Sequence, residues 1–278
     1  MVAMGVKRMR YDRSPRKIER WMKEGRGAGR NSTYQPWLTV RDVPSRGKST
    51  RVYGWHTGRV HHFLSQLEEF YFYTLEWRRD ILDIREQFPL LPLHETVQIA
   101  ELLRVDHPRD KKGNLVVMTE DFLITCSGPR GEIIKARSIK PAPELQSRRV
   151  WEKLRIAQEY WRRRGTDWGL VTDREIDPIL AMNVRQVHAY RDPAALGLDP
   201  RQVMPIETVL RQLLHESPRV PHRLVAKKCD DILGLESGTS LAVTWHLIAV
   251  RRLEVDMTVP LHPNKPLPLV KREDGGQS

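Results

Sequence analysis

The sequence predicts an α/β protein whose mixed sheet is covered by helices and is followed by a smaller helical domain. Between residues 57 and 172, segments with helical periodicity alternate with short runs of strand-forming residues, in the order helix, strand, hairpin, helix, strand. That order is typical of a mixed sheet with helices on its faces. Beyond residue 180, three short helical segments precede an expected strand at 255–259, which is the order of a winged helix-turn-helix.

The composition favours a polyanionic partner. The chain of 278 residues carries a formal net charge of +12, and the commonest partner of so basic a protein is nucleic acid. No apolar run has the length of a membrane span, and no secretory segment follows Met1. The two cysteines, Cys126 and Cys229, lack the spacing of zinc ligands and fit the reducing cytoplasm in which we expect the protein.

Residues 1–30 hold ten basic and three acidic residues, more than half of the excess positive charge. Ser14 followed by proline is typical of a helix start, and a glycine-rich stretch at 25–29 is expected to end that helix. Two interpretations remain open: a basic arm that lies along DNA phosphates, and a solvated, disordered tail. In the first interpretation, Arg26 and Arg30 are candidate DNA contacts.

The segment after the glycines, residues 31–56, is expected to be extended. Strand-forming residues predict short strands at 36–40 and 51–53. A Pro-Ser-Arg-Gly cluster at 44–47 predicts the turn between them.

An amphipathic helix is predicted next, because apolar residues recur at steps of three and four across residues 60–75. Within it, Glu68 has apolar neighbours one turn before and one turn after, so its carboxylate leans toward the apolar face. A carboxylate rarely faces inward unless it is paired or binds a metal. Arg59, His61 and His62 are candidates for DNA contact, although a histidine pair near a helix start is also typical of structural or solvated side chains.

Residues 118–140 predict a β-hairpin, with strand formers on both sides of a turn at 127–131. Because side chains alternate across a strand, Asp121 and Lys140 can meet at adjacent strand ends. Such a pair suits metal-dependent phosphodiester hydrolysis: the carboxylate holds a hard cation, which lowers the pKa of a bound water, and the lysine stabilises developing charge. The alternative is an ordinary surface salt bridge across a hairpin.

The other elements of the predicted core follow from the same patterns. They are a strand at 81–90, a helix at 96–105, a helix at 143–164 and a strand at 168–172. The predicted domain organisation has a basic arm at 1–30, an α/β domain at 31–173, a helical domain at 174–260 and a tail at 261–278. The segment from Pro260 to the end has four prolines and too little apolar content to fold, so we expect the tail to be disordered.

The C-terminal third predicts helices rather than strands. Helical segments are expected at 173–190, 206–215, 219–233 and 239–252. The body of the last helix, residues 241–250, contains no Arg, Lys or Asn, so it is a poor reader of base edges. We therefore favour a protein-docking role for this domain over DNA reading.

Several stretches, taken in order, resemble the TnsA family, the endonuclease subunits of heteromeric, Tn7-like cut-and-paste transposases. The resemblance covers roughly residues 18–175 and is weak beyond about residue 180. No single stretch is decisive, but the ordered set is specific. The matching stretches are 36–40, 57–62, 64–68, 83–91, 118–123, 140–142 and 152–154.

The resemblance implies a fold like that of type II restriction endonucleases, and Mg²⁺-dependent hydrolysis of the 5′ ends of a transposon. Glu68, Asp121 and Lys140 match the family's catalytic residues. Glu68, Asp121 and the carbonyl of Ile139 match its metal ligands. Restriction-type enzymes usually carry an acid two residues before the lysine, where this chain has Ser138, and this leaves the number of metal ions open.

The resemblance also implies three partners: transposon-end DNA, a DDE-type subunit (TnsB) that cuts and joins the 3′ ends, and the AAA+ regulator TnsC. In the family, TnsC contacts the C-terminal region. Two other functions remain open: a stand-alone nuclease with the same core, and a non-catalytic DNA-binding adaptor with a vestigial nuclease core. Metal dependence separates the nucleases from the adaptor, and dependence on partner subunits separates the two nucleases.

Overall fold

The computed structural model describes residues 14–43, 49–194, 197 and 199–270. The chain divides into two compact units, with the boundary between Ile176 and Asp177, three residues beyond the boundary expected from the sequence. Among the described residues, no helix combines the length and the apolar character needed to cross a membrane.

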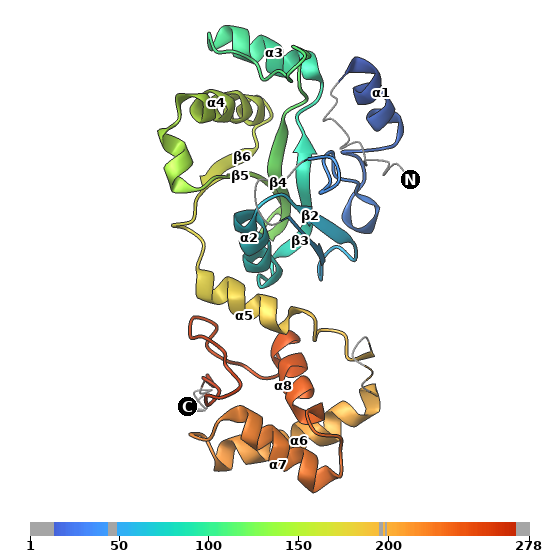
Figure 1. The fold of residues 1–278 in the computed structure, drawn as a ribbon, viewed down its shortest axis with the longest axis vertical. Coiled ribbons are helices and arrows are strands. Elements are labelled where there is room, and N and C mark those ends of the chain that lie inside the picture. Colours follow the sequence, from blue (N-terminus) through green and yellow to red (C-terminus); the bar gives the residue numbers. More distant parts are fainter. Residues whose placement is uncertain (1–13, 44–48, 195–196, 198, 271–278) are drawn as a thin grey trace, which may run out of the picture. The chain divides into compact units, whose positions relative to one another are not determined.

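The first unit is built on a four-stranded mixed sheet (Figure 1). Its strands are β3 (Ile81–Pro89), β4 (Thr119–Gly128), β5 (Gly131–Ile139) and β6 (Asp167–Val171), and they lie in that order across the sheet. The first three are antiparallel neighbours, whereas β6 runs parallel to β5. The predicted α/β core with a mixed sheet is therefore confirmed.

The central hairpin pairs β4 with β5 from Phe122 opposite Arg137 to the turn at Gly128 and Gly131. Gly131 has φ +120°, a backbone conformation that side-chain-bearing residues rarely adopt. Leu123 lies opposite Ala136, and both are buried in one apolar cluster with side chains of α3 and α4. Asp121 lies two positions before Leu123 in the same strand, near its start.

Helices cover both faces of the sheet. On one face, α3 (Leu93–Leu102) and α4 (Arg148–Arg162) contribute Ile99, Ile156 and Trp161 to the apolar cluster. A 3₁₀ helix, η2 (Ala142–Gln146), precedes α4, so the predicted helix at 143–164 is divided in two. On the other face, the ring of Phe122 contacts Tyr71 of α2 (Gln66–Glu76).

The helix expected to include residues 60–65 begins later than predicted. Residues 60–63 form strand β2 (Val60–Phe63), which pairs with β1 (Thr50–Tyr53) in a separate two-stranded sheet. Ser65 then caps α2, because its side chain accepts a hydrogen bond from the backbone N–H of Glu68. The apolar residues before Ser65 fit a helical spacing, but along residues 60–63 every second side chain is buried, as in a strand.

The described part of the N-terminal arm packs onto the first unit. Helix α1 (Pro15–Lys23) agrees with the prediction, and a 3₁₀ turn, η1 (Asn31–Thr33), follows it. Trp21 is buried and meets Trp37 edge-to-face, with 5.2 Å between ring centroids. The disordered-tail interpretation is therefore wrong for residues 14–30, whereas an arm that lies along DNA phosphates stays a prediction; residues 1–13 lie outside the described residues.

Two smaller predictions in this region have different outcomes. The segment 36–40 is not a strand, and it holds Trp37 and Leu38 in an apolar cluster instead. The predicted turn at 44–47 lies outside the described residues.

The second unit is helical in its described part. Its helices are α5 (Pro178–His188), α6 (Pro200–Glu216), α7 (His222–Leu233) and α8 (Thr239–Ala249). The strand predicted at 255–259 is reduced to one antiparallel bridge between Val255 and Leu269, so the winged-helix assignment stays a prediction.

The predicted disordered tail is wrong for residues 261–270. Leu261 and Leu267 are buried, and the N–H of Leu261 donates to the Asn183 side chain at 2.9 Å. The carbonyl of Lys265 accepts from the N–H of His222 at 3.1 Å. Few apolar residues suffice here, because the backbone of the segment bonds to the helices; residues 271–278 lie outside the described residues.

Candidate active site

The structure joins Asp121 and Lys140 directly. Asp121 Oδ2 accepts hydrogen bonds from Lys140 Nζ and from the backbone N–H of Ile139, each at 2.7 Å. Lys140 Nζ also donates to the carbonyl oxygen of Ile139 at 2.8 Å. The ammonium therefore bridges two of the three oxygen groups that were expected to hold a metal.

Strand pairing fixes the positions of these two residues. Asp121 is the third residue of β4, and Lys140 follows the last residue of β5. The backbone N–H of Lys140 donates to the carbonyl of Val171 at the end of β6, at 3.0 Å. The parallel neighbour thus holds the end of β5 in place beside the start of β4.

Glu68 is held at the start of α2 by a reciprocal capping arrangement. Ser65 Oγ accepts from the N–H of Glu68 at 3.2 Å and donates to Glu68 Oε1 at 2.9 Å. The N–H of Leu64 donates to Glu68 Oε2 at 3.0 Å. The carboxylate is buried, as the apolar neighbours of Glu68 predicted, and its negative charge interacts with Asp121 and Lys140.

The electrostatics of the three residues favour a cation between the carboxylates. Burial, and then the charge of Asp121, raises the pKa of Glu68 to about 7. Burial lowers the pKa of Lys140, but the charge of Asp121 and its hydrogen bond outweigh burial, so the net pKa is raised. Lys140 is consequently a protonated hydrogen-bond donor at neutral pH.

Gln87, which the sequence did not single out, belongs to the same site. Its side chain is buried; Nε2 lies 3.4 Å from Glu68 Oε2, and Oε1 accepts from Thr119 Oγ1 at 3.0 Å. The available signal was an amide among the apolar residues at the end of β3, which is an unfavourable place for an unpaired polar group.

A buried carboxylate, Glu120, lies beneath the site and was also missed. The hydroxyl of Ser138 donates to it, and so do the indole N–H groups of Trp161, at 2.6 Å, and Trp168, at 3.1 Å. Burial raises the pKa of Glu120 to about 7. Ser138, at the position where restriction-type enzymes carry an acid, is thus tied to Glu120.

Asp121 and Lys140 open into a pocket of about 290 Å³. The walls come from the segment before β4, from η2 and from α4. Its lining residues are Leu38, Pro108, Val116, Val117, Met118, Thr119, Asp121, Ser138, Lys140, Glu144, Val150, Lys153, Leu154 and Ala157.

The donor set fits a hard divalent cation. The oxygen atoms of Glu68, Asp121 and the Ile139 carbonyl are the ligand types that Mg²⁺ prefers. The Lys140 ammonium already places a positive charge between Asp121 and Ile139, which marks this position as favourable for a cation. In the described ranges, no three His, Cys, Asp or Glu side chains are grouped closely enough to form a metal site by themselves, so carbonyl and water ligands would have to complete the shell.

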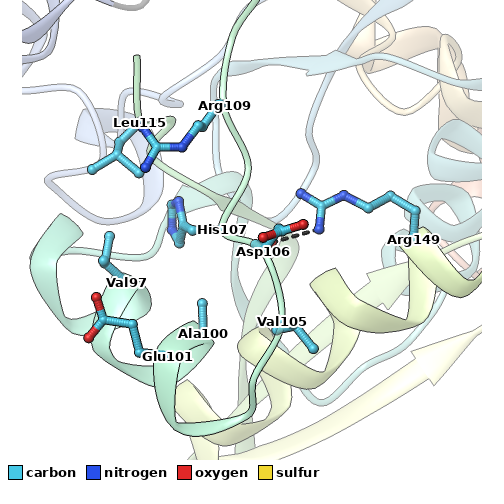
Figure 2. Close-up of a pocket in the computed structure, with 9 residues that line it drawn as sticks. All are labelled: Val97, Ala100, Glu101, Val105, Asp106, His107, Arg109, Leu115 and Arg149. Atoms are coloured by element: carbon cyan, nitrogen blue, oxygen red, sulfur yellow. Dashed lines mark hydrogen bonds between the residues drawn. The ribbon is translucent and has the colours of Figure 1, made fainter. Parts of the chain in front are cut away.

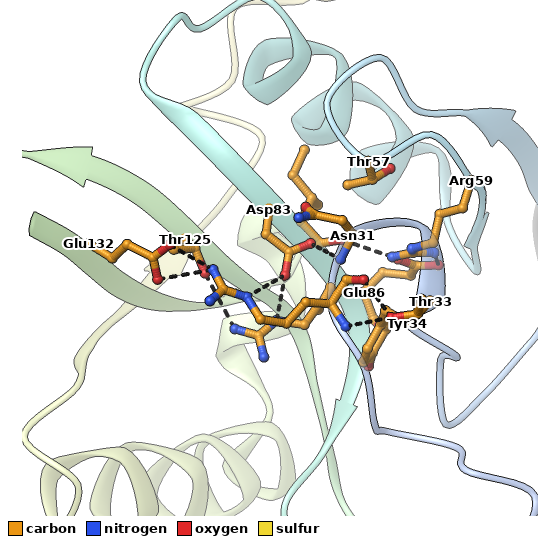
Figure 3. Close-up of polar contacts among 12 residues, drawn as sticks. Asn31, Thr33, Tyr34, Thr57, Arg59, Asp83, Glu86, Thr125 and Glu132 are labelled. Atoms are coloured by element: carbon orange, nitrogen blue, oxygen red, sulfur yellow. Dashed lines mark hydrogen bonds and ion pairs between the residues drawn. The ribbon is translucent and has the colours of Figure 1, made fainter.

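Arg59 and His61, predicted as DNA contacts, are interior residues. Arg59 donates to Glu86 Oε1 and to the carbonyl of Ile84, each at 2.8 Å (Figure 3). The ring of His61 lies 2.7 Å from both Glu86 and Thr57. Burial opposes ionisation of Glu86, but His61 and Arg59 outweigh it and lower its pKa. The prediction fails for both residues because each is buried against a carboxylate within the protein.

The other three candidates differ in their exposure. Burial is the main cause that lowers the pKa of His62, which is half-buried. Arg26 donates to Asp42 at 2.8 Å, with 19% of its side chain exposed. Arg30 is 49% exposed and pairs with Glu132 at 3.0 Å. Arg26 is thus another internal contact, whereas Arg30 lies at the surface.

A larger pocket of about 520 Å³ is lined in part by the segment that precedes β4 (Figure 2). Pro108 lines the pocket of Asp121, whereas its neighbours His107 and Arg109 line the larger one. None of the predicted catalytic residues reaches the larger pocket. Its lining residues are Val97, Ala100, Glu101, Val105, Asp106, His107, Arg109, Leu115 and Arg149.

Comparisons with known proteins agree with this geometry. The family model described as TnsA-like endonuclease N terminal matches residues 78–173, a span that includes Asp121 and Lys140. The model described as TnsA endonuclease C terminal matches residues 175–257. Transposon Tn7 transposition protein TnsA of Escherichia coli is 40% identical over 249 residues, which cover 89% of this chain and 88% of the relative.

Proposed function

The chain belongs to the TnsA endonuclease family, and from that premise we propose that it hydrolyses the 5′ ends of a transposon with a divalent metal, Mg²⁺. In this proposal it works with a DDE-type subunit, TnsB, that cuts and joins the 3′ ends. The observation that carries the proposal is the ammonium of Lys140 between Asp121 Oδ2 and the Ile139 carbonyl. That arrangement supplies both a position for a cation and a hydrogen-bond donor for the negatively charged phosphate.

The chemistry divides between the metal and the residues of the chain. A bound divalent cation supplies a water of lowered pKa and offsets charge on the phosphate. Glu68, Asp121 and the Ile139 carbonyl would hold that cation. Lys140 donates hydrogen bonds, either to the attacking oxygen or to the phosphate. Water adds to phosphorus, one P–O bond breaks, and the leaving oxygen takes a proton.

The DNA reaches the site across the rim of its pocket. A scissile phosphate must pass the segment around Pro108, η2 and α4, because they form the pocket walls. Exposed basic side chains lie on this segment and this helix, and they replace Arg59 and His61 as phosphate contacts. These side chains are Arg109, Lys111, Lys112, Arg148, Lys153 and Arg155.

The second unit serves in protein docking, and TnsC is the partner that we propose. Residues 243–249 of α8 are all buried, so the body of this helix has no surface to insert into a major groove. This burial adds to the lack of Arg, Lys and Asn in its sequence. A docking role therefore suits the unit better than base reading.

Strand-specific cleavage of labelled transposon-end DNA in Mg²⁺ tests the proposal. We would compare wild type, Asp121→Ala and a control, Asp80→Ala, with and without the DDE-type subunit. Asp80 pairs with Arg78 at the surface, so its loss changes charge equally without touching the site. We expect 5′-strand cleavage that requires the partner, survives in Asp80→Ala and is lost in Asp121→Ala.

The other outcomes separate the alternatives. Cleavage by the chain alone would favour a stand-alone nuclease. Wild type that cleaves under no condition would favour the non-catalytic adaptor. Cleavage by Asp121→Ala at the wild-type rate would refute the assignment of the site.

A further inference from the structure

Strand β3 leaves the regular strand conformation at Gln87. Its φ is +49°, in the left-handed region that residues other than glycine rarely adopt. The residues before and after Gln87 pair with the residues after and before Asp121 on β4, so Gln87 lies in line with Asp121. Such strained positions persist where the surroundings determine them, and they gather at functional sites.

The side chain of Gln87 links two elements of the site. Thr119 Oγ1 on β4 donates to Gln87 Oε1 at 3.0 Å. The Nε2 end of the same amide faces Glu68 Oε2 on α2, at 3.4 Å. A hydroxyl, an amide and a carboxylate thus form a chain from β4 to α2.

The start of α2 does not need this amide for its structure. Ser65 and the N–H of Leu64 already supply the bonds that cap the helix and hold both oxygens of Glu68. The backbone of Gln87 has a separate contact, in which its carbonyl accepts from the N–H of Trp37 at 3.2 Å. That contact survives any change of side chain. What the amide adds is a tie between the Glu68 carboxylate and the strand that carries Asp121.

We propose that Gln87, oriented by Thr119, is a positioning residue that holds the Glu68 carboxylate in register with Asp121 for cation binding. The inference rests on the proposed function, since the cation serves the hydrolysis proposed above. An N–H donor aimed at a carboxylate favours its ionised, metal-binding form. Without the amide, only the capping bonds at the start of α2 would fix the position of the Glu68 carboxylate.

Three variants test the proposal. Gln87→Met removes the amide but keeps the length of the side chain. Because neither residue is glycine, the substitution also leaves the backbone preference for φ similar. Thr119→Val removes the orienting hydroxyl, and Thr119→Ser keeps it and serves as the matched control. For each full-length protein we would measure Mn²⁺ affinity by electron paramagnetic resonance without DNA, the melting temperature, and cleavage against Mg²⁺ concentration.

The expected result separates positioning from folding. Gln87→Met and Thr119→Val should bind Mn²⁺ more weakly by about 10-fold, within the 10–100-fold range typical of residues that orient metal ligands. Their melting temperatures should stay near that of wild type, and Thr119→Ser should match wild type throughout. Unchanged Mn²⁺ affinity in Thr119→Val would overturn the proposal. If Gln87→Met does not fold, the Mn²⁺ affinity of Thr119→Val alone tests the proposal.

Two further results have defined meanings. Equal losses in Thr119→Val and Thr119→Ser, accompanied by lower melting temperatures, would overturn positioning in favour of a structural role. Wild type that binds Mn²⁺ but never cleaves DNA would refute the proposed function. The Mn²⁺ affinities of the variants would still test the positioning role of Gln87. Wild type that binds no Mn²⁺ would overturn both.

Discussion

The Lys140 ammonium and the Asp121 carboxylate lie 2.7 Å apart, with 30% and 13% of their side chains exposed. The same ammonium is 2.8 Å from the carbonyl of Ile139. A divalent cation that uses both oxygens must therefore displace Lys140 from between them, which would leave the ammonium free to face the phosphate. The pair differs from an exposed surface salt bridge, because both side chains are mostly buried and Lys140 also donates to the Ile139 carbonyl.

Replacing Lys140 by methionine should separate cation binding from turnover. The substitution removes the charge that competes for Asp121 Oδ2 and keeps most of the side-chain volume. We expect Mn²⁺ affinity that is equal to or higher than that of wild type, and a loss of cleavage of at least about 100-fold, the size found when a transition-state donor is removed. Calorimetric Mn²⁺ titration and single-turnover cleavage would measure the two. Loss of Mn²⁺ binding instead would give the lysine a structural role.

Cation affinity should depend on pH through Glu68. Burial and Asp121 raise its pKa to about 7, so below pH 7 a cation must displace a proton from the carboxyl group. Mn²⁺ affinity should therefore fall by up to about tenfold per pH unit below 7, and it should level off above 8. Titrations at pH 6, 7 and 8 check this, with Glu68→Gln as control. A wild-type slope no steeper than that of the control would contradict the assignment.

Glu120 should make the metal-free protein less stable as pH rises. Burial raises its pKa from 4.5 to about 7, so between these values the folded chain holds a proton that the unfolded chain has lost. Stability consequently decreases as pH rises through this window, by roughly 3 kcal/mol at most. In Glu120→Gln, the amide can still accept from Trp161 and Trp168 and donate to Ser138.

Urea unfolding of wild type and Glu120→Gln at pH 5, 6 and 7 would measure this effect. The free energy of unfolding of the variant should change less across the series than that of wild type. Parallel pH profiles would show that Glu120 does not carry the titration.

Local patterns allowed much of the fold and part of the site to be predicted. Alternation along the hairpin was enough to place Asp121 and Lys140 at adjacent strand ends, because their strands are joined by a short turn. The start of α2 was misplaced, since the apolar residues at 60, 63 and 64 have the spacing of a helix, although residues 60–63 form a strand. The decisive residue was Ser65, whose capping bond depends on local geometry rather than on periodicity.

Pairings across the chain explain the rest. Arg59 and His61 meet Glu86 more than twenty positions away, through the packing of β2 against β3, which no local pattern specifies. The basic side chains at these positions were therefore predicted to contact DNA, although their partner is Glu86 inside the protein. Gln87 was missed for a related reason: its left-handed backbone occurs without a glycine to signal it, and its contacts come from two other elements.

The internal role of Arg59 predicts loss of stability rather than of DNA binding. Its side chain is 7% exposed and pairs with Glu86, which is fully buried. Arg59→Met leaves Glu86 with one strong partner fewer, so we expect a loss of roughly 3–5 kcal/mol in the free energy of unfolding. Urea unfolding measures this value. An unchanged stability with weaker DNA binding would restore Arg59 to the DNA surface.

The rim of the active-site pocket should account for part of the salt dependence of DNA binding. Lys111 and Lys112 are exposed on the segment whose Pro108 lines that pocket. If both contact phosphates, the double change to serine should reduce the slope of log affinity against log salt by nearly two, since each phosphate contact contributes about 0.9. The melting temperature should not change, because neither side chain is buried.

Lys227→Ser is the matched control, because Lys227 is an exposed lysine of α7 paired with Asp231 in the second unit. Fluorescence anisotropy with labelled transposon-end DNA between 50 and about 200 mM salt, a range over which phosphate contacts change affinity strongly, gives the slopes. Equal slopes for the double variant and wild type would exclude this segment from the DNA path, and a slope reduced only in Lys227→Ser would move the path to the helical unit.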